Sequence, residues 1–245
     1  MQEKTSDKYM ALQALWTKQT RNYLYRRANL AHAKHILDVG CGTGVLTAEI
    51  AERTCGTITG IDNNPAVIEK ALSRFPTIDF KVADAEKLLF KNESFDIVLC
   101  HFFLMWVDKL SRVLQEIFRV TKKNGYIIAC AEPDYYELIE EPPDCVMKNF
   151  LIESLLFEGA DPSTGGKLKE IFSEAGLDCE VGSLTKQQES EELLASFDIR
   201  WNVYSRIAEK RGVDISELKE KEFIALKAGT RSFTLPVFWA FTKKI

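Results

Sequence analysis

The sequence predicts an α/β fold: a seven-stranded, mostly parallel sheet with helices on both faces. Short apolar runs alternate with helical segments through the first 132 residues, and the first of these runs ends in a glycine-rich loop that opens a helix. Alternation at this spacing favours parallel strands joined by right-handed crossovers. Because 245 residues suffice for one large domain, we expect a single domain over 1–245.

The N-terminal segment, 1–31, is predicted to be a helical lid. From residue 6 onward its apolar side chains recur at spacings typical of one helix face: Tyr9, Leu12, Trp16 and Tyr23. The seven predicted strands follow, at residues 35–39, 57–61, 78–82, 95–100, 126–131, 178–185 and 232–242. Pro236 predicts an edge position or a bulge in the last strand, because proline cannot donate a ladder hydrogen bond.

Helices are expected between the first five strands, at 44–53, from the N-cap pair Asn64 and Pro65 onward, and at 108–120. After the fifth strand the rhythm changes. An apolar helical stretch at 146–157 lies within a proline-rich segment, 133–163, and a further helix is expected at 164–175. Residues 189–228 are helical and rich in charge. We expect 133–163 and 189–228 to be helical insertions above the carboxyl ends of the strands.

The composition is that of an ordinary globular protein, with 46% hydrophobic and 28% charged residues and a net charge of −4. No apolar run approaches the roughly 20 residues that span a bilayer, and the first residues lack the apolar core of a signal peptide, so we expect a cytoplasmic protein without membrane contact. One basic stretch, interpreted as a solvated helix face or a patch for an anionic ligand, comprises Lys18, Arg21, Arg26 and Arg27. Nucleic acid is not an expected partner.

The cysteines predict no metal site. None of the six forms a C-x-x-C pair, which zinc and redox motifs require: Cys41, Cys55, Cys100, Cys130, Cys145 and Cys179. Three of them lie within or beside predicted strands, where we expect a free thiol to behave as a small hydrophobe.

The strongest motif is the loop from Asp38 to Gly44, Asp-Val-Gly-Cys-Gly-Thr-Gly, which follows a strand and precedes a helix. Its glycines permit a tight turn and a close approach of a ligand to the backbone. The spacing is G-x-G-x-G, whereas the dinucleotide pattern would require glycine where Val45 stands. A nicotinamide-dependent oxidoreductase is therefore disfavoured, and the Tyr-x-x-x-Lys pair of one such class is also missing after Tyr135 and Tyr136.

The charges around this loop suit a cation. No Lys or Arg occurs between Ile36 and Arg53, and three acids stand at strand ends: Asp38, Asp62 and Asp84. S-adenosylmethionine (SAM) carries a sulfonium, an ammonium, a ribose diol and an adenine, but no phosphate. Acidic groups at the carboxyl ends of strands complement that molecule.

Five segments together resemble the class I (Rossmann-like) SAM-dependent methyltransferase family across the first 132 residues. They are ILDVGCGTG, GIDNNPAVIEKA, FKVADAEKLLF, ESFDIVLCHFFLMWV and EIFRVTKKNGYIIACAEPDY, in the order and at the spacing typical of the family. The resemblance implies a SAM-binding core at 32–132 and a role for each matching residue. The methionine part would be held by Asp38, Gly40, Cys41, Gly42 and Gly44. The ribose and adenine would be held by Asp62, Asn63, Asp84 and Ala85, with the backbone of Cys100 lining the pocket.

The acceptor side is less specific. His101 follows the fourth strand and is the candidate catalytic base, since an imidazole suits proton transfer at neutral pH; the alternative is a histidine packed in its loop. Trp106, Tyr135 and Tyr136 are the candidate substrate contacts, with core packing the alternative for Trp106 and loop cover for the tyrosines. The acids that end the fifth strand, Glu132 and Asp134, would attract an amine acceptor or serve the turn.

The expected function is methyl transfer from SAM, by in-line displacement, to a small or medium-sized molecule. We expect the insertions at 133–163 and 189–228 to cap the acceptor, and the protein to be a monomer or homodimer. Two alternatives stay open: a protein or RNA methyltransferase, and a catalytically silent SAM-binding regulator or partner protein. A SAM signature reports binding, so it does not separate the last from an enzyme.

Overall fold

A single mixed sheet organises the chain in the computed structural model, which describes residues 3–143 and 147–245; Cys145 and Val146 lie outside them. The strand order is β3-β2-β1-β4-β5-β8-β6, and β7 pairs with β8 off this path. The first five strands pair in parallel with one another: β1 (His35–Val39), β2 (Thr57–Asp62), β3 (Asp79–Val82), β4 (Phe95–Cys100) and β5 (Thr121–Pro133). The predicted mostly parallel α/β sheet is confirmed.

Adjacent residues of the central strands face opposite sides of this sheet, as a period of two requires. Leu37 of β1 packs with α5 (Leu110–Val120) and α7 (Leu168–Glu174), whereas its neighbour Ile36 packs with α2 (Lys18–Arg27) and α3 (Val45–Ala51). The strands are therefore apolar on both faces, which explains why they form continuous apolar runs in the sequence. The remaining crossover helix, α4 (Pro65–Arg74), begins at Asn64, whose side chain accepts from the Ala66 N–H as predicted for an N-cap.

The sheet has eight strands in the described residues, so the prediction of seven is wrong in number. The additional strand, β6 (Ile139–Glu141), lies in a segment predicted to be helical, and three residues are too few to show an alternating pattern. The last two strands, β7 (Glu180–Glu189) and β8 (Ser232–Lys243), are antiparallel to each other.

Strand β8 is not at the edge of the sheet, contrary to one interpretation of Pro236. One side of β8 pairs along its length with β7, and its other side pairs with β5 at 237–243 and with β6 at 232–234. Pro236 falls where β5 gives way to β6, and its carbonyl accepts from the Asp134 N–H at that break. The ladder donor that proline lacks would point toward this interruption, so its absence removes no strand pairing.

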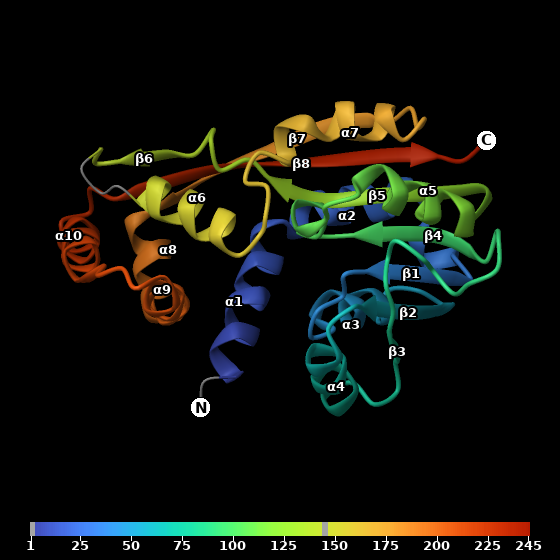
Figure 1. Ribbon diagram of the computed structural model, residues 1–245, viewed down its shortest axis with the longest axis horizontal. Helices are drawn as coiled ribbons and strands as arrows, with labels where there is room; N and C mark the ends of the chain where they lie inside the picture. Colours follow the sequence, from blue (N-terminus) through green and yellow to red (C-terminus); the bar gives the residue numbers. More distant parts are fainter. Residues whose placement is uncertain (1–2, 144–146) are drawn as a thin grey trace.

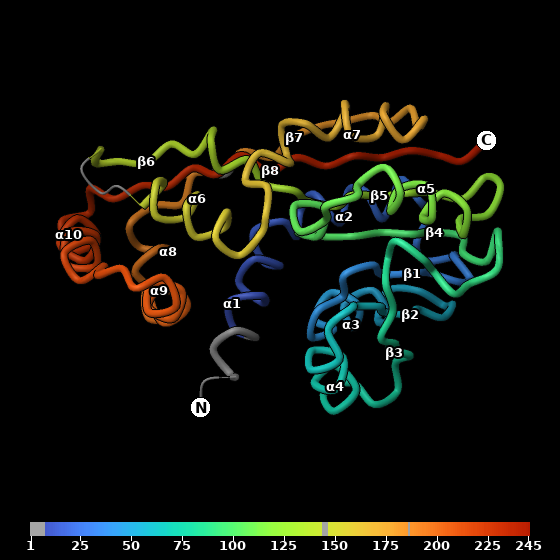
Figure 2. Tube along the Cα trace, in the orientation of Figure 1, coloured from blue at the N-terminus to red at the C-terminus, as the bar shows by residue number. Residues whose placement is uncertain are grey.

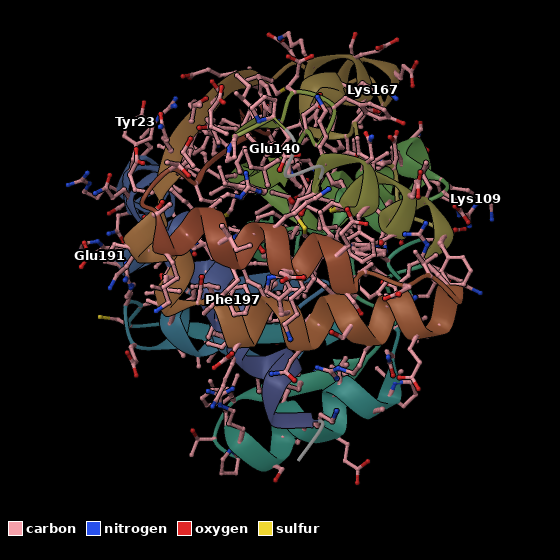
Figure 3. The ribbon with its side chains drawn as sticks, turned by 90° about the vertical axis from the view of Figure 1, so that its left-hand side faces the viewer. Tyr23, Lys109, Glu140, Lys167, Glu191 and Phe197 are labelled. Atoms are coloured by element: carbon pink, nitrogen blue, oxygen red, sulfur yellow. The ribbon has the colours of Figure 1, made fainter. Side chains whose placement is uncertain are left out.

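The amino-terminal half of β8 carries a second unit, which we call the cap: β6, α6 (Met147–Phe157), α8 (Ser190–Ala195), α9 (Phe197–Arg211) and α10 (Ser216–Lys227). In Figure 1 these elements lie at one end of β8 and the parallel strands at the other. Figure 3 looks onto α9 and α10, where the ring of Phe197 packs 5.4 Å from that of Phe223. The segment 189–228, predicted to be helical, forms three helices.

Buried ion pairs join the elements of the cap to one another and to the residue that precedes β8. Glu222 accepts from Arg200 at 3.0 Å and from the indole N–H of Trp201, and Arg231 pairs with Glu140 at 2.7 Å. All are buried or nearly so, so removing one partner would leave an uncompensated charge. The two arginines are therefore committed to the interior of the cap.

The N-terminal segment is two helices, α1 (Glu3–Trp16) and α2, with Thr17 as a turn between them. Figure 2 shows α1 descending between the cap and the parallel strands. Arg21 of α2 is 1% exposed and pairs with Glu49 at 2.6 Å, so the expected solvated basic face is wrong at this position. No helix among the described residues is long and apolar enough to cross a membrane.

Candidate functional site

A cavity of about 730 Å³ opens above the carboxyl ends of β1, β2 and β4. Its wall comes from the glycine-rich loop and the strand ends on one side, and from α1, α6, α9 and the loop after β4 on the other. Cavities of this size accommodate cofactors and drug-sized molecules. We call the first side the cofactor end and the second side the acceptor end.

The backbone shapes the cofactor end. Gly40, Gly42 and Gly44 have φ values of 73°, 53° and 78°, a region that side chains rarely permit. A Cβ on Gly40 would lie 2.3 Å from the ring of Phe103, so nothing larger than glycine fits there. The loop is held in place by the N–H groups of Gly40 and Cys41, which both donate to the Ile61 carbonyl of β2.

Asp38 lies at the base of this loop and is 1% exposed. One of its carboxylate oxygens accepts from the Thr47 hydroxyl at 2.6 Å. Burial, assisted by the negative charge of Asp62, raises the pKa of Asp38 to about 7, while Thr47 and Arg21 act in the opposite direction. A cation arriving beside Asp38 would favour its ionised form.

Asp62 joins the glycine loop to the start of α4. Its two carboxylate oxygens accept from the N–H groups of Gly42 and Asn64, each at 3.0 Å. A carboxylate has about four acceptor sites, so both oxygens keep capacity for a diol. Beyond it, Asp84 is exposed in a turn in which it accepts from the Glu86 N–H at 2.8 Å. The acids predicted at three strand ends therefore border one cavity.

Most of the residues that the resemblance assigned to SAM line this cavity: Asp38, Gly40, Cys41, Gly42, Asp62, Asn63, Asp84 and Ala85. Two do not. Gly44 caps the start of α3 with Phe80 packed against it, and Cys100 is buried within β4, where its thiol has a raised pKa because of burial. The binding role of each residue stays a prediction.

The acceptor end is made by segments far apart in the sequence. Residues 9–14 of α1, 151–158 of α6 and 203–207 of α9 contribute side chains that meet the loop after β4. His101 of that loop lines the cavity, as does Trp106, which is 45% exposed. Core packing, the alternative for Trp106, is therefore wrong.

The two adjacent tyrosines separate. Tyr135 is buried and lines the cavity together with Tyr9 and Tyr204, whose rings meet edge to face at 6.4 Å. Tyr136 is 49% exposed and does not line the cavity, because the chain turns after Asp134, which accepts from the Tyr136 N–H at 3.0 Å. The structure therefore brings Tyr135, and not Tyr136, to the acceptor end.

Glu132 supports the acceptor end from below. It is fully buried, and its carboxylate accepts from the backbone N–H groups of residues 103 and 104 at 2.9 Å and of Met105 at 3.4 Å. Burial raises the pKa of Glu132 to about 7, against these three donors. Neither Glu132 nor Asp134 lines the cavity, so loop chemistry is the interpretation that the contacts support. The sequence signal, an acid at a strand end, was too common to assign this role.

The described cavity wall carries several carboxyl side chains but no lysine or arginine. Among the described residues, no Lys or Arg lines it, while six carboxyl side chains do: Asp38, Asp62, Asp84, Glu86, Asp108 and Glu158. A phosphate-bearing dinucleotide would find no cationic partner there. SAM fits this donor set, because its cationic groups meet carboxylates and the glycine cradle leaves room for close backbone approach.

A methyltransferase domain family matches residues 37–129, which contain the entire cofactor end of the cavity. A trans-aconitate 2-methyltransferase of Enterobacter sp. (strain 638) is 30% identical over 166 residues, 66% of this chain and 64% of the relative. A demethylmenaquinone methyltransferase of Chlorobaculum parvum is 37% identical over 95 residues, 38% of this chain and 39% of the relative. These matches therefore cover less than two thirds of the relatives' own length.

Solved structures support the fold over a longer range. The YcgJ protein of Bacillus subtilis superposes with a TM-score of 0.64 at 17% identity, covering 93% of this chain and 98% of that one. At this identity the likeness concerns the fold alone.

Proposed function

We propose that this chain, which belongs to the class I SAM-dependent methyltransferase family, transfers a methyl group from SAM to a small, largely apolar molecule. The observation that carries the proposal is the continuity of the cavity: the acidic cofactor end and the apolar acceptor end form one space. A methyl donor bound at the first would lie directly beside a molecule held at the second.

The lining of the acceptor end indicates the size and polarity of the methyl acceptor. Its wall is closed from above by α1, α6 and α9, which suits a small ligand better than a long polymer. Most of its side chains are apolar: Met10, Ala14, Phe102, Met105, Leu151, Leu155, Val203 and Ile207. Its polar side chains are Tyr9, Gln13, His101, Tyr135, Ser154, Glu158 and Tyr204, of which only Glu158 is a carboxylic acid. With no cationic side chain in the described wall, an anionic acceptor would lose its hydration without compensation.

SAM, when bound, would supply a methyl group on an electrophilic sulfonium. The glycine loop and Asp38 would bind its methionine part, and Asp62 its ribose hydroxyls. The remaining residues would act on the acceptor: the apolar wall excludes water, and the hydroxyl of Tyr135 orients a polar atom of the acceptor. Positioning and desolvation suffice for an acceptor whose reacting atom already bears a free electron pair.

The names of the two relatives indicate different methyl acceptors, so the acceptor class proposed for this chain rests on the lining of its own cavity. The test is a screen of neutral aromatic and aliphatic metabolites, with matched carboxylates, using methyl-labelled SAM and mass spectrometry of the products. We expect methylated neutral compounds. Methylation of the carboxylates in preference to the neutral compounds would contradict the acceptor class. Tight SAM binding without any labelled product would instead favour the silent SAM-binding protein.

A further inference from the structure

The junction between α1 and α2 contacts a residue of the site. Thr17, the turn residue of this junction, is 1% exposed, and its hydroxyl oxygen lies 2.8 Å from Nε2 of His101. His101 stands at the end of β4, 84 positions further along the chain. Among the described residues, this hydrogen bond between the helix junction and the cavity is the only polar contact of the His101 ring.

The other partners of Thr17 decide which group donates. Arg21, a donor without acceptor capacity, donates to the Thr17 hydroxyl oxygen and to the Ala14 carbonyl. Thr17 has one hydroxyl proton, and its alternative acceptor, the Gln13 carbonyl, is 3.5 Å away. The contact with Nε2 of His101, at 2.8 Å, is the shorter of the two, so we assign the Thr17 hydroxyl proton to it. In the neutral ring the proton then lies on Nδ1.

The surroundings of His101 keep that ring neutral. Burial and the positive charge of Arg21 both lower the pKa of His101 well below its usual value. Arg21 is itself held by Glu49 at 2.6 Å, so its charge is fixed beside the Thr17 hydroxyl. An imidazolium would also need to donate from Nε2 toward a hydroxyl that already accepts from this cation.

The second ring nitrogen, Nδ1, makes no hydrogen bond with the described residues, and it is not among their buried polar atoms that lack a partner, so it is accessible. Because His101 lines the acceptor end of the cavity, we assign the space that Nδ1 reaches to that end. This leaves a free N–H directed at whatever binds there.

We infer that Thr17 is a positioning residue that fixes His101 as its neutral Nδ1–H form, so that His101 offers the acceptor a hydrogen-bond donor rather than a basic nitrogen. The inference rests on the proposed function and deepens it. In this largely apolar wall, the donor at Nδ1 selects an acceptor that carries an uncharged oxygen or nitrogen able to accept a hydrogen bond. The expectation that His101 is the base gives way to this assignment.

The test is nitrogen NMR of the full-length protein labelled at histidine, without cofactor or acceptor. The chain has three histidines, so His101 is assigned by comparison with His101→Asn. We expect a protonated Nδ1 and an unprotonated Nε2 at neutral pH. A proton on Nε2, or on both nitrogens, overturns the inference. The spectrum of the wild-type protein decides between these outcomes, and the variant serves only to assign the signals.

Two matched variants locate the cause in the Thr17 hydroxyl. Thr17→Ser keeps the donor and should retain the Nδ1–H form, whereas Thr17→Val keeps the shape and should yield a mixture of both neutral forms. An unchanged spectrum in Thr17→Val would overturn the role of Thr17. Thr17 does not line the cavity, so SAM affinity, measured by calorimetry, should stay within about threefold in both variants. A protein that fails to bind SAM refutes the proposed function and leaves the assignment of the tautomer to stand or fall on the spectrum.

Discussion

The two ends of the cavity are built in different ways. The cofactor end comes from one stretch of about fifty residues, 38–86, and uses backbone conformation and fixed carboxylates. The acceptor end is assembled from α1, the loop after β4, α6 and α9, and it uses side chains that are nearly all neutral. Backbone-built recognition depends on a few glycines and acids at set spacings, so it can be predicted from a sequence. Recognition built from distant helices depends on tertiary packing.

If the cofactor end depends on backbone shape, the most damaging single change is Gly40→Ala. A positive φ costs an ordinary residue roughly 1–2 kcal/mol, and the new Cβ would also overlap the Phe103 ring. We expect SAM affinity to fall about 100-fold by calorimetry. The matched control is Gly212→Ala, which has a similar φ of 67° but open space around the Cβ. Equal SAM affinities for the two variants would show that the loop shape is unimportant.

The second prediction concerns the carboxylate contribution at the same end. Asp62→Ala removes the acceptor for the Gly42 and Asn64 N–H groups and for the ribose, so SAM affinity should fall about tenfold or more. Asp79→Ala is the control, because Asp79 is exposed at the far end of β3 and pairs only with Thr59 and Lys81. Wild-type affinity in a folded Asp62→Ala protein would remove Asp62 from the site.

At the acceptor end, a change should affect turnover and leave SAM binding alone. Tyr135→Phe keeps the buried ring and removes one hydroxyl from the wall, so turnover of the identified acceptor should fall about threefold to tenfold. Tyr136→Phe, one residue later and outside the wall, should behave as wild type. Steady-state kinetics and calorimetry measure the two effects separately. A larger loss in Tyr136→Phe than in Tyr135→Phe would contradict the placement of the two rings.

The smallest expected effect is a pH dependence at the cofactor end. The pKa of Asp38 is raised to about 7, so near neutral pH a fraction of the protein carries a protonated Asp38. The positively charged ligand favours the carboxylate, so binding releases that proton, and SAM affinity should fall about threefold between pH 7.5 and 6.5. Calorimetry in two buffers of different ionisation enthalpy counts the protons. Asp38→Asn should bind SAM more weakly but without this slope, and a slope that persists in it would assign the titration to another group.

The features that could be predicted from the sequence are those that depend on local patterns. The parallel strands, the glycine loop and the N-cap at Asn64 depend on local patterns, and the structure confirms the fold that they predict. Arg21 could not be placed in this way. Its helix has basic residues on several faces, and only the packing of α2 against α3 buries this one beside Glu49.

The contacts of the acceptor end could not be predicted either, because they also depend on tertiary packing. Nothing near Thr17 in the sequence indicates a contact with His101, because the two are joined only by the way α1 and α2 cross the end of β4. Trp106 stands in an apolar run that resembles core, yet its side chain turns into the cavity wall. Tyr135 and Tyr136 are adjacent and chemically alike, and one backbone turn gives them different surroundings.

Strand β8 has a consequence for the order in which the molecule can be assembled. It follows all three of its partners in the chain, and it is the strand that β5, β6 and β7 share. Until β8 is synthesised, β5 presents an open edge, and β6 and β7 have no strand to pair with. Folding of the parallel strands can begin earlier, because their contacts are nearer in sequence. The acceptor end, by contrast, must be among the last parts to form, and for that interval the growing chain exposes strand edges on which a chaperone or another nascent chain could pair.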